Sequence, residues 1–192
     1  MEKIVLKFIA LTFSLMALIS CNNDDYNGDI ADEGPSAPLM FSINAKGTAI
    51  GELVENYALP GTELKVSGNA FTMPMFNPVT GETMGTVIDI NVNAETFGDG
   101  SMFAENYTLF FFEDEQESIL VLHNWIDMVP APPTFMDAFI KKEHTLDNVV
   151  SGSGLFSDFT GGATLNASLD MKDFDKNTVG FDCLYGFTQK VF

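Results

Sequence analysis

Strict alternation of apolar and polar residues near the end of the chain is the strongest constraint on its fold. Every second residue from Ala163 to Met171 is apolar, and the residues between them are polar. The same period of two returns from Val179 to Phe187, after a stretch of turn-forming residues at 173–178. Because successive side chains of a strand point to opposite faces, each segment is predicted to be a strand with one face on the core. Together they are predicted to form an antiparallel hairpin.

Shorter alternating patterns predict further strands around residues 41–43, 64–66 and 88–92. A second hairpin is predicted from Tyr107–Phe112 and Ile119–Trp125, which an acidic turn joins. No helical period is sustained along the chain after its N-terminal segment. The fold class is therefore predicted to be all-β, either a single antiparallel β-barrel of about eight strands or a β-sandwich.

Two segments depart from simple alternation. Leu109–Phe112 is apolar at every position, which predicts a strand that is covered on both sides or that lines a barrel with a second layer outside it. A small helix is expected around Thr134–Lys142, directly after a run of prolines. Neither segment changes the prediction of a β domain.

The N-terminus has the layout of a secretory signal. Lys3 and Lys7 precede an apolar run from Phe8 to Ile19. This run of 12 residues is shorter than the roughly 20 that a membrane-spanning helix needs. It ends in Leu18-Ile19-Ser20-Cys21, which resembles the lipobox of bacterial lipoproteins. The resemblance implies cleavage before Cys21 and attachment of a diacylglycerol to its thiol.

With the composition and the β pattern, this resemblance leads to an expected organisation in three parts: a signal peptide at 1–20, a lipidated disordered tether at 21–38 and a β-barrel domain at 39–192. The tether is polar and acidic, with no apolar periodicity. Its first acidic residues, at 24 and 25, resemble the export signal of surface-exposed lipoproteins. The expected location is the bacterial outer membrane, where the lipid on Cys21 would anchor a periplasmic or surface-exposed domain.

The charge of the chain excludes one class of partner. There are 27 acidic and 9 basic residues, a net charge of -18, and none of the basic residues is arginine. Nucleic-acid binding depends on dense lysine and arginine contacts to phosphate, so no nucleic-acid partner is expected. The acidic surface is interpreted as a source of solubility.

A glycine-rich stretch carries a second resemblance. Residues 152–156 (Gly-Ser-Gly-Leu-Phe), followed by Thr160–Ala163, are similar to a signature of the eight-stranded barrels of the allene oxide cyclase and dirigent type. In those barrels the glycine-rich turn leads into a long C-terminal hairpin, and apolar substrates bind inside. Leu155 replaces the usual basic residue, and no catalytic residue of the family has a match here. Lipocalin-like barrels and sandwiches remain alternatives.

Motifs for catalysis or metal binding do not emerge. The only histidines, His123 and His144, lack the spacing of a zinc site. Asp173–Asn177 resembles the start of a calcium loop, but Thr178 and Leu184 occupy the positions that need glycine and glutamate, so a turn is predicted instead. No nucleophile elbow or phosphate-binding loop is present in the sequence. The chain is therefore predicted not to be an enzyme and to need no cofactor or metal.

The chain contains 18 phenylalanines, and this aromatic surplus is the one feature with a possible meaning for binding. The candidate residues of an apolar interior are Phe110, Phe112, Phe181, Tyr185 and Phe187. An eight-stranded barrel is about filled by its own side chains, so a packed core is favoured over a ligand cavity. Cys183 lies in the same row and is interpreted as a small apolar filler.

The expected function is a non-enzymatic surface interaction or binding role in the cell envelope. The alternative is carriage of a small apolar ligand in the barrel interior or, behind it, a cyclase- or isomerase-like barrel. A continuous apolar cavity of several hundred Å³ would favour the alternative, and a filled barrel would reject it.

Overall fold

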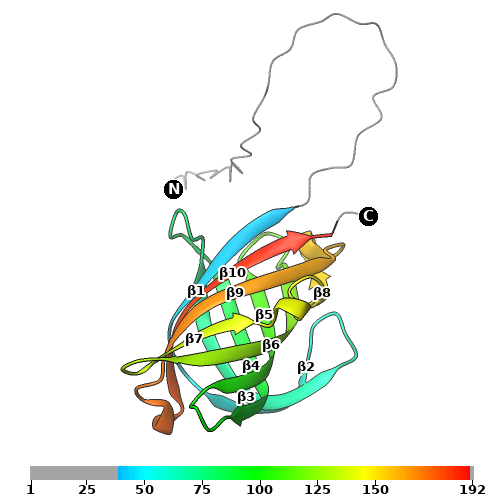
Figure 1. Ribbon diagram of the computed structural model, residues 1–192. Coiled ribbons are helices and arrows are strands. Elements are labelled where there is room, and N and C mark those ends of the chain that lie inside the picture. Colours follow the sequence, from blue (N-terminus) through cyan, green and yellow to red (C-terminus); the bar gives the residue numbers. More distant parts are fainter. Residues whose placement is uncertain (1–38, 191–192) are drawn as a thin grey trace, which may run out of the picture. The chain divides into compact units, whose positions relative to one another are not determined.

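The computed structural model describes residues 39–190, and within this range nearly all regular structure is β (Figure 1). The strands are β1 (Met40–Ile50), β2 (Glu52–Ala58), β3 (Lys65–Phe76), β4 (Thr83–Thr96), β5 (Met102–Phe112), β6 (Ile119–Ala131), β7 (Phe135–Ile140), β8 (Val149–Ser153), β9 (Gly161–Asp170) and β10 (Thr178–Gln189). Short 3-10 helices are η1 (Lys142–His144), η2 (Gly154–Phe156) and η3 (Phe174–Lys176). The predicted signal peptide, Cys21 and the tether lie outside the described residues.

The strands close into an antiparallel barrel. Their order is β1-β10-β9-β7-β6-β5-β4-β3, and β3 returns to β1 through the pairs Asn44–Phe76 and Ala45–Met75. Two strands lie outside this ring, β2 on β3 and β8 on β6. The prediction of an all-β fold is confirmed, and of the two predicted architectures the structure adopts the barrel and not the sandwich. Within residues 39–190 no helix has the length and apolar character needed to cross a bilayer.

Both predicted hairpins are confirmed. In the C-terminal hairpin Ala163 pairs with Phe187 and Leu169 with Phe181, so the two alternating rows share one face. The turn between them contains η3, and Asn177 ends it in the left-handed region at φ 57°, a conformation that asparagine tolerates better than most residues. In the other hairpin β5 pairs with β6 from Met102 to Phe111.

The helix expected at Thr134–Lys142 is wrong, because most of this segment is strand β7. Its side chains alternate, with Met136, Ala138 and Ile140 buried and the residues between them exposed. β7 pairs with β6 on one side and β9 on the other. This two-sided pairing satisfies its backbone hydrogen bonds, and the period of two decides against a helix. A single 3-10 turn, η1, follows it.

The barrel wall is covered on both sides along β4, β5 and β6. Phe110 packs in the inner core, whereas its neighbour Leu109 belongs to a second, outer cluster with Ile90 and Val121. Side chains of β2, among them Val54, pack over that outer cluster. The apolar run Leu109–Phe112 is thus explained as predicted, by burial on both faces.

Candidate functional site

The barrel interior is divided into two halves along the strands, and one half is filled by phenylalanine rings. Phe187 of β10 stacks on Phe41 of β1 with ring centroids 4.6 Å apart and meets Phe110 of β5 edge-on at 5.2 Å. Phe156 also stacks on Phe41, at 5.4 Å. We refer to these rings as the aromatic cluster; its members are Phe41, Phe110, Phe112, Phe156, Phe159 and Phe187.

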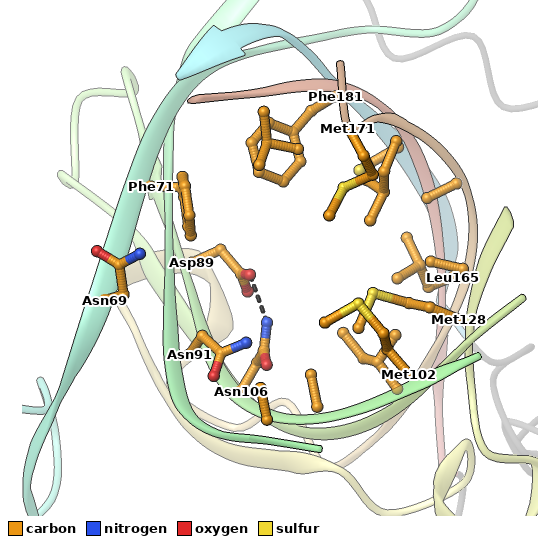
Figure 2. Close-up of a pocket in the computed structure, with 18 of the residues that line it drawn as sticks. Asn69, Phe71, Asp89, Asn91, Met102, Asn106, Met128, Leu165, Met171 and Phe181 are labelled. Carbon is orange, nitrogen blue, oxygen red and sulfur yellow. Dashed lines mark hydrogen bonds between the residues drawn. The ribbon is translucent and has the colours of Figure 1, made fainter. Parts of the chain in front are cut away.

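The other half of the interior holds a cavity of about 240 Å³ (Figure 2). Tyr185 forms its floor, since this ring is only 4% exposed and contacts Phe110 of the aromatic cluster edge-on at 5.0 Å. The lining becomes more exposed toward Ala94 at the end of β4 and toward Phe174, which lies in the turn between β9 and β10 and is 46% exposed. The cavity therefore reaches solvent at the end of the barrel that carries this turn.

The two sides of the cavity differ in chemistry, as Figure 2 shows. One side is apolar and rich in sulfur, with side chains from β5, β6, β9 and β10 and from the residue that directly follows β9. Its main members are Met102, Met128, Leu165, Leu169, Met171 and Cys183. The facing side, on β4 and β5, carries Asp89, Asn91 and Asn106. A ligand here would meet apolar surface over most of its area and polar groups along one edge.

Asp89 is the central group of the polar side. Asp89 is 8% exposed, and its carboxyl group accepts hydrogen bonds from Thr108 Oγ1 at 2.7 Å and from Asn106 Nδ2. Burial in an apolar surrounding disfavours the charged form and raises the pKa of Asp89 to about 6, although the two hydrogen bonds act in the opposite direction. The carboxyl group therefore changes its charge close to neutral pH.

A chain of hydrogen bonds holds this carboxyl group in place from behind. Thr108 Oγ1 accepts from Asn124 Nδ2 at 2.9 Å, and Asn124 Oδ1 accepts from Asn148 Nδ2 at 2.8 Å. Asn148 Oδ1 in turn accepts from the backbone N–H of Ala163 on β9 at 2.7 Å, and the backbone N–H of His123 on β6 donates to Asn148 O at 2.9 Å. Asn148 thus links β6 to β9, and the polar side of the cavity is built on a fixed network.

One buried atom of the polar side has no hydrogen-bond partner. Asn106 is 5% exposed, and its Oδ1 is buried without a hydrogen bond. Such an orphaned acceptor costs free energy unless a donor reaches it. In the part of the chain that the structure describes, no lysine or histidine lines the cavity. The other titratable lining groups are Cys183 and Tyr185, and burial raises the pKa of both, so both are neutral at physiological pH.

The residues proposed from the sequence for an apolar interior fall on both sides of this division. Phe181 and Tyr185 line the cavity. Phe110, Phe112 and Phe187 belong to the aromatic cluster instead. Cys183, from the same row of β10, is buried in the cavity wall.

The polar residues of the cavity were missed in the sequence. Asp89 and Asn91 alternate with Ile88 and Ile90, so they resemble the solvent row of an ordinary half-buried strand. In the barrel the isoleucines face the outer cluster, and the polar row faces inward. A usable signal was the phase of β5, because Asn106 stands in the same row as the interior candidate Phe110.

Both histidines lie on the outer face of the barrel. His123 Nε2 is 2.8 Å from Glu105 Oε1. The His123 ring stacks on Tyr107 at 4.3 Å and makes a tilted contact with Trp125 at 4.0 Å. His144 packs on the same Trp125 at 4.1 Å. Across residues 39–190, no three His, Cys, Asp or Glu side chains are close enough together to hold a metal ion.

The segment that resembles the start of a calcium loop is the turn between β9 and β10, as predicted. Asp173 forms an ion pair with Lys176 within this turn. Its carboxylate is therefore held by a side chain of the chain itself.

Comparison with known proteins identifies no relative of this chain. No protein-family model, no curated protein and no solved structure matches the chain. Its chemistry is therefore argued from the cavity itself.

Proposed function

We propose that this protein is a lipid-anchored binding protein of the cell envelope that holds a small, largely apolar ligand inside the barrel. The observation that carries the proposal is the cavity of about 240 Å³, with its apolar side and its mouth at the turn between β9 and β10. A barrel that needed only to be stable could fill this half with aromatic rings, as it fills the other half.

The volume sets the size of the ligand. A cavity of about 150 Å³ accommodates benzene, so the space here suits a ligand of about ten non-hydrogen atoms. The methionines on the apolar side, Met102, Met128 and Met171, are flexible and can adapt their shape to different apolar groups. The proposal is therefore for a compact ligand, bound mainly by burial of its apolar surface.

Filling the cavity should abolish binding. Ala167 is a small, buried lining residue of β9, and Ala167→Phe would place a ring in the empty space. Naphthalene, a neutral hydrocarbon of suitable size, is expected to bind the full chain, and its affinity should fall at least about tenfold in this variant. A fluorescence titration measures both values.

The matched control for this experiment is Asn166→Phe, which adds the same ring at the neighbouring, outward-facing position of β9. It is expected to bind naphthalene like the parent chain. If circular dichroism shows that both chains are folded and Ala167→Phe binds naphthalene as tightly as the parent, the cavity is rejected as the binding site.

The membrane part of the proposal rests on the lipobox resemblance at Cys21. Cys21→Ala removes the thiol that would carry the lipid, so in a bacterial host with lipoprotein processing the protein should leave the membrane fraction. The reason is that a signal segment of this length gives no stable anchor by itself. Fractionation followed by immunoblotting measures the change, and undiminished retention in the membrane contradicts the proposed anchor.

An isomerase-like activity is the second candidate, and one observation favours it. Asp89 faces an apolar cavity with a pKa of about 6, which suits a group that accepts and returns a proton near neutral pH. Recovery of a bound physiological ligand with unchanged structure would reject this candidate and leave the binding proposal in place.

A further inference from the structure

We propose that the ligand carries a protonated amine, which pairs with Asp89 and donates a hydrogen bond to Asn106 Oδ1. This inference rests on the proposed function and specifies the chemical class of the ligand: a small apolar body with one ammonium group. Two features of the cavity and the charge of the chain lead to it.

The first feature is a buried carboxylate without a cation. The hydrogen-bond partners of Asp89 are the neutral side chains of Thr108 and Asn106. Among the described residues that line the cavity, none is a lysine or a histidine. Buried charges in proteins are generally paired because an isolated one is costly. An ammonium group on a ligand would supply the missing opposite charge.

The second feature is the unpartnered acceptor. Asn106 Nδ2 already donates a hydrogen bond to Asp89. Asn106 Oδ1 is buried and accepts no hydrogen bond. The ligand must therefore donate at this point. A carboxylate ligand cannot donate and would be repelled by Asp89, which excludes fatty-acid anions. A hydroxyl group donates once, whereas an ammonium group has three N–H donors and can serve Asp89 and Asn106 together.

The third feature is the electrostatic field. With a net charge of -18, the chain attracts cations and repels anions at a distance. Inside the cavity, Cys183 and Tyr185 remain neutral because burial raises the pKa of each group. Asp89 is thus the one lining group of the described chain that is charged at neutral pH. The net negative charge of the chain and the carboxylate of Asp89 both favour a positively charged ligand.

The test compares three compounds that share one apolar tail and differ only in the head group: octylamine, octanol and octanoate. Each is titrated calorimetrically into the full chain at pH 7.5. Octylamine is expected to bind at least about tenfold more tightly than octanol, and octanoate more weakly than octanol. In Asp89→Asn the affinity for octylamine should fall at least about tenfold, while the affinity for octanol changes less than about threefold.

Asp182→Asn is the matched control, because it removes one negative charge from the outer face of β10, next to the cavity residue Cys183. It should leave the preference for octylamine intact. Loss of that preference in the control would assign it to overall charge and overturn the pairing with Asp89.

The possible failures are distinguishable. Octanol or octanoate binding as tightly as octylamine overturns the amine but leaves the cavity as an apolar binding site. If naphthalene binds and none of the octyl compounds does, the amine is likewise overturned and the cavity remains an apolar binding site. If neither naphthalene nor any octyl compound binds, both the proposed function and this inference fail.

Discussion

Phe187→Ala is expected to lower the free energy of unfolding by about 3–5 kcal/mol, the usual cost of removing a buried phenylalanine. Phe187 is almost fully buried and lies between Phe41 and Phe110 in the aromatic cluster. Its removal leaves a hole between rings that are fixed on different strands and cannot easily close it. Urea unfolding followed by circular dichroism measures the change.

The control for this experiment is Leu184→Ala on the same strand. Leu184 is 42% exposed, so its truncation should cost less than about 1 kcal/mol. Equal losses in the two variants would show that the aromatic cluster is not where the stability of the barrel is concentrated.

Asp89→Asn is expected to stabilise the protein above pH 6. The pKa of Asp89 is about 6 in the folded chain, against 3.8 for an aspartate side chain that is exposed to water. Between these values the folded state binds more protons than the unfolded state, so the contribution of Asp89 to stability falls as the pH rises. Above pH 6 the buried carboxylate costs about 3 kcal/mol, and below about pH 4 the cost is absent.

The new amide can replace the carboxylate without losing partners. Its oxygen can accept from Thr108, and its NH2 group can donate to Asn106 Oδ1 once the Asn106 amide turns over. Urea unfolding of parent and variant at pH 4 and pH 8 should therefore give similar values at pH 4 and a more stable variant at pH 8. A difference between the chains that does not change with pH would contradict this account.

Asp182→Asn provides a comparison of opposite sign. Hydrogen bonds from Lys46 and Asn44 lower the pKa of Asp182, so its charged form is favoured by folding. Its contribution is present above the unfolded pKa and is lost as the pH falls. At pH 8 this replacement should slightly destabilise the chain, with a small effect because the ion pair is exposed.

The sequence predicts the barrel well where alternation is regular. Strands β9 and β10 were located from their period of two, since one row packs on the core and the other faces solvent. β7 was missed because the preceding prolines and its short length, Phe135–Ile140, concealed the same period. Its pairing with β6 and β9 is a long-range contact, which local pattern does not reveal.

The cavity was harder to predict, and the reason is the second layer outside the barrel. Along β4 the apolar row of Ile88 and Ile90 was expected to face the core, yet it faces the outer cluster under β2. The outer cluster decides which of the two rows of β4 faces the barrel interior. Without knowing of it, Asp89 could not be recognised as a cavity residue. Likewise Phe181 and Phe187 occupy equivalent places in one alternating row. Only the alignment of β10 with its neighbours places the first at the cavity and the second in the aromatic cluster.

The division of the interior has a consequence for how this chain could evolve. Packing that maintains the fold is gathered in the aromatic cluster around Phe187, whereas ligand contacts would be made by separate residues such as Met128 and Leu165. Exchanges on the cavity side can then change which compound is bound while stability stays above the threshold that selection enforces. A barrel of this design can acquire new specificities one side chain at a time.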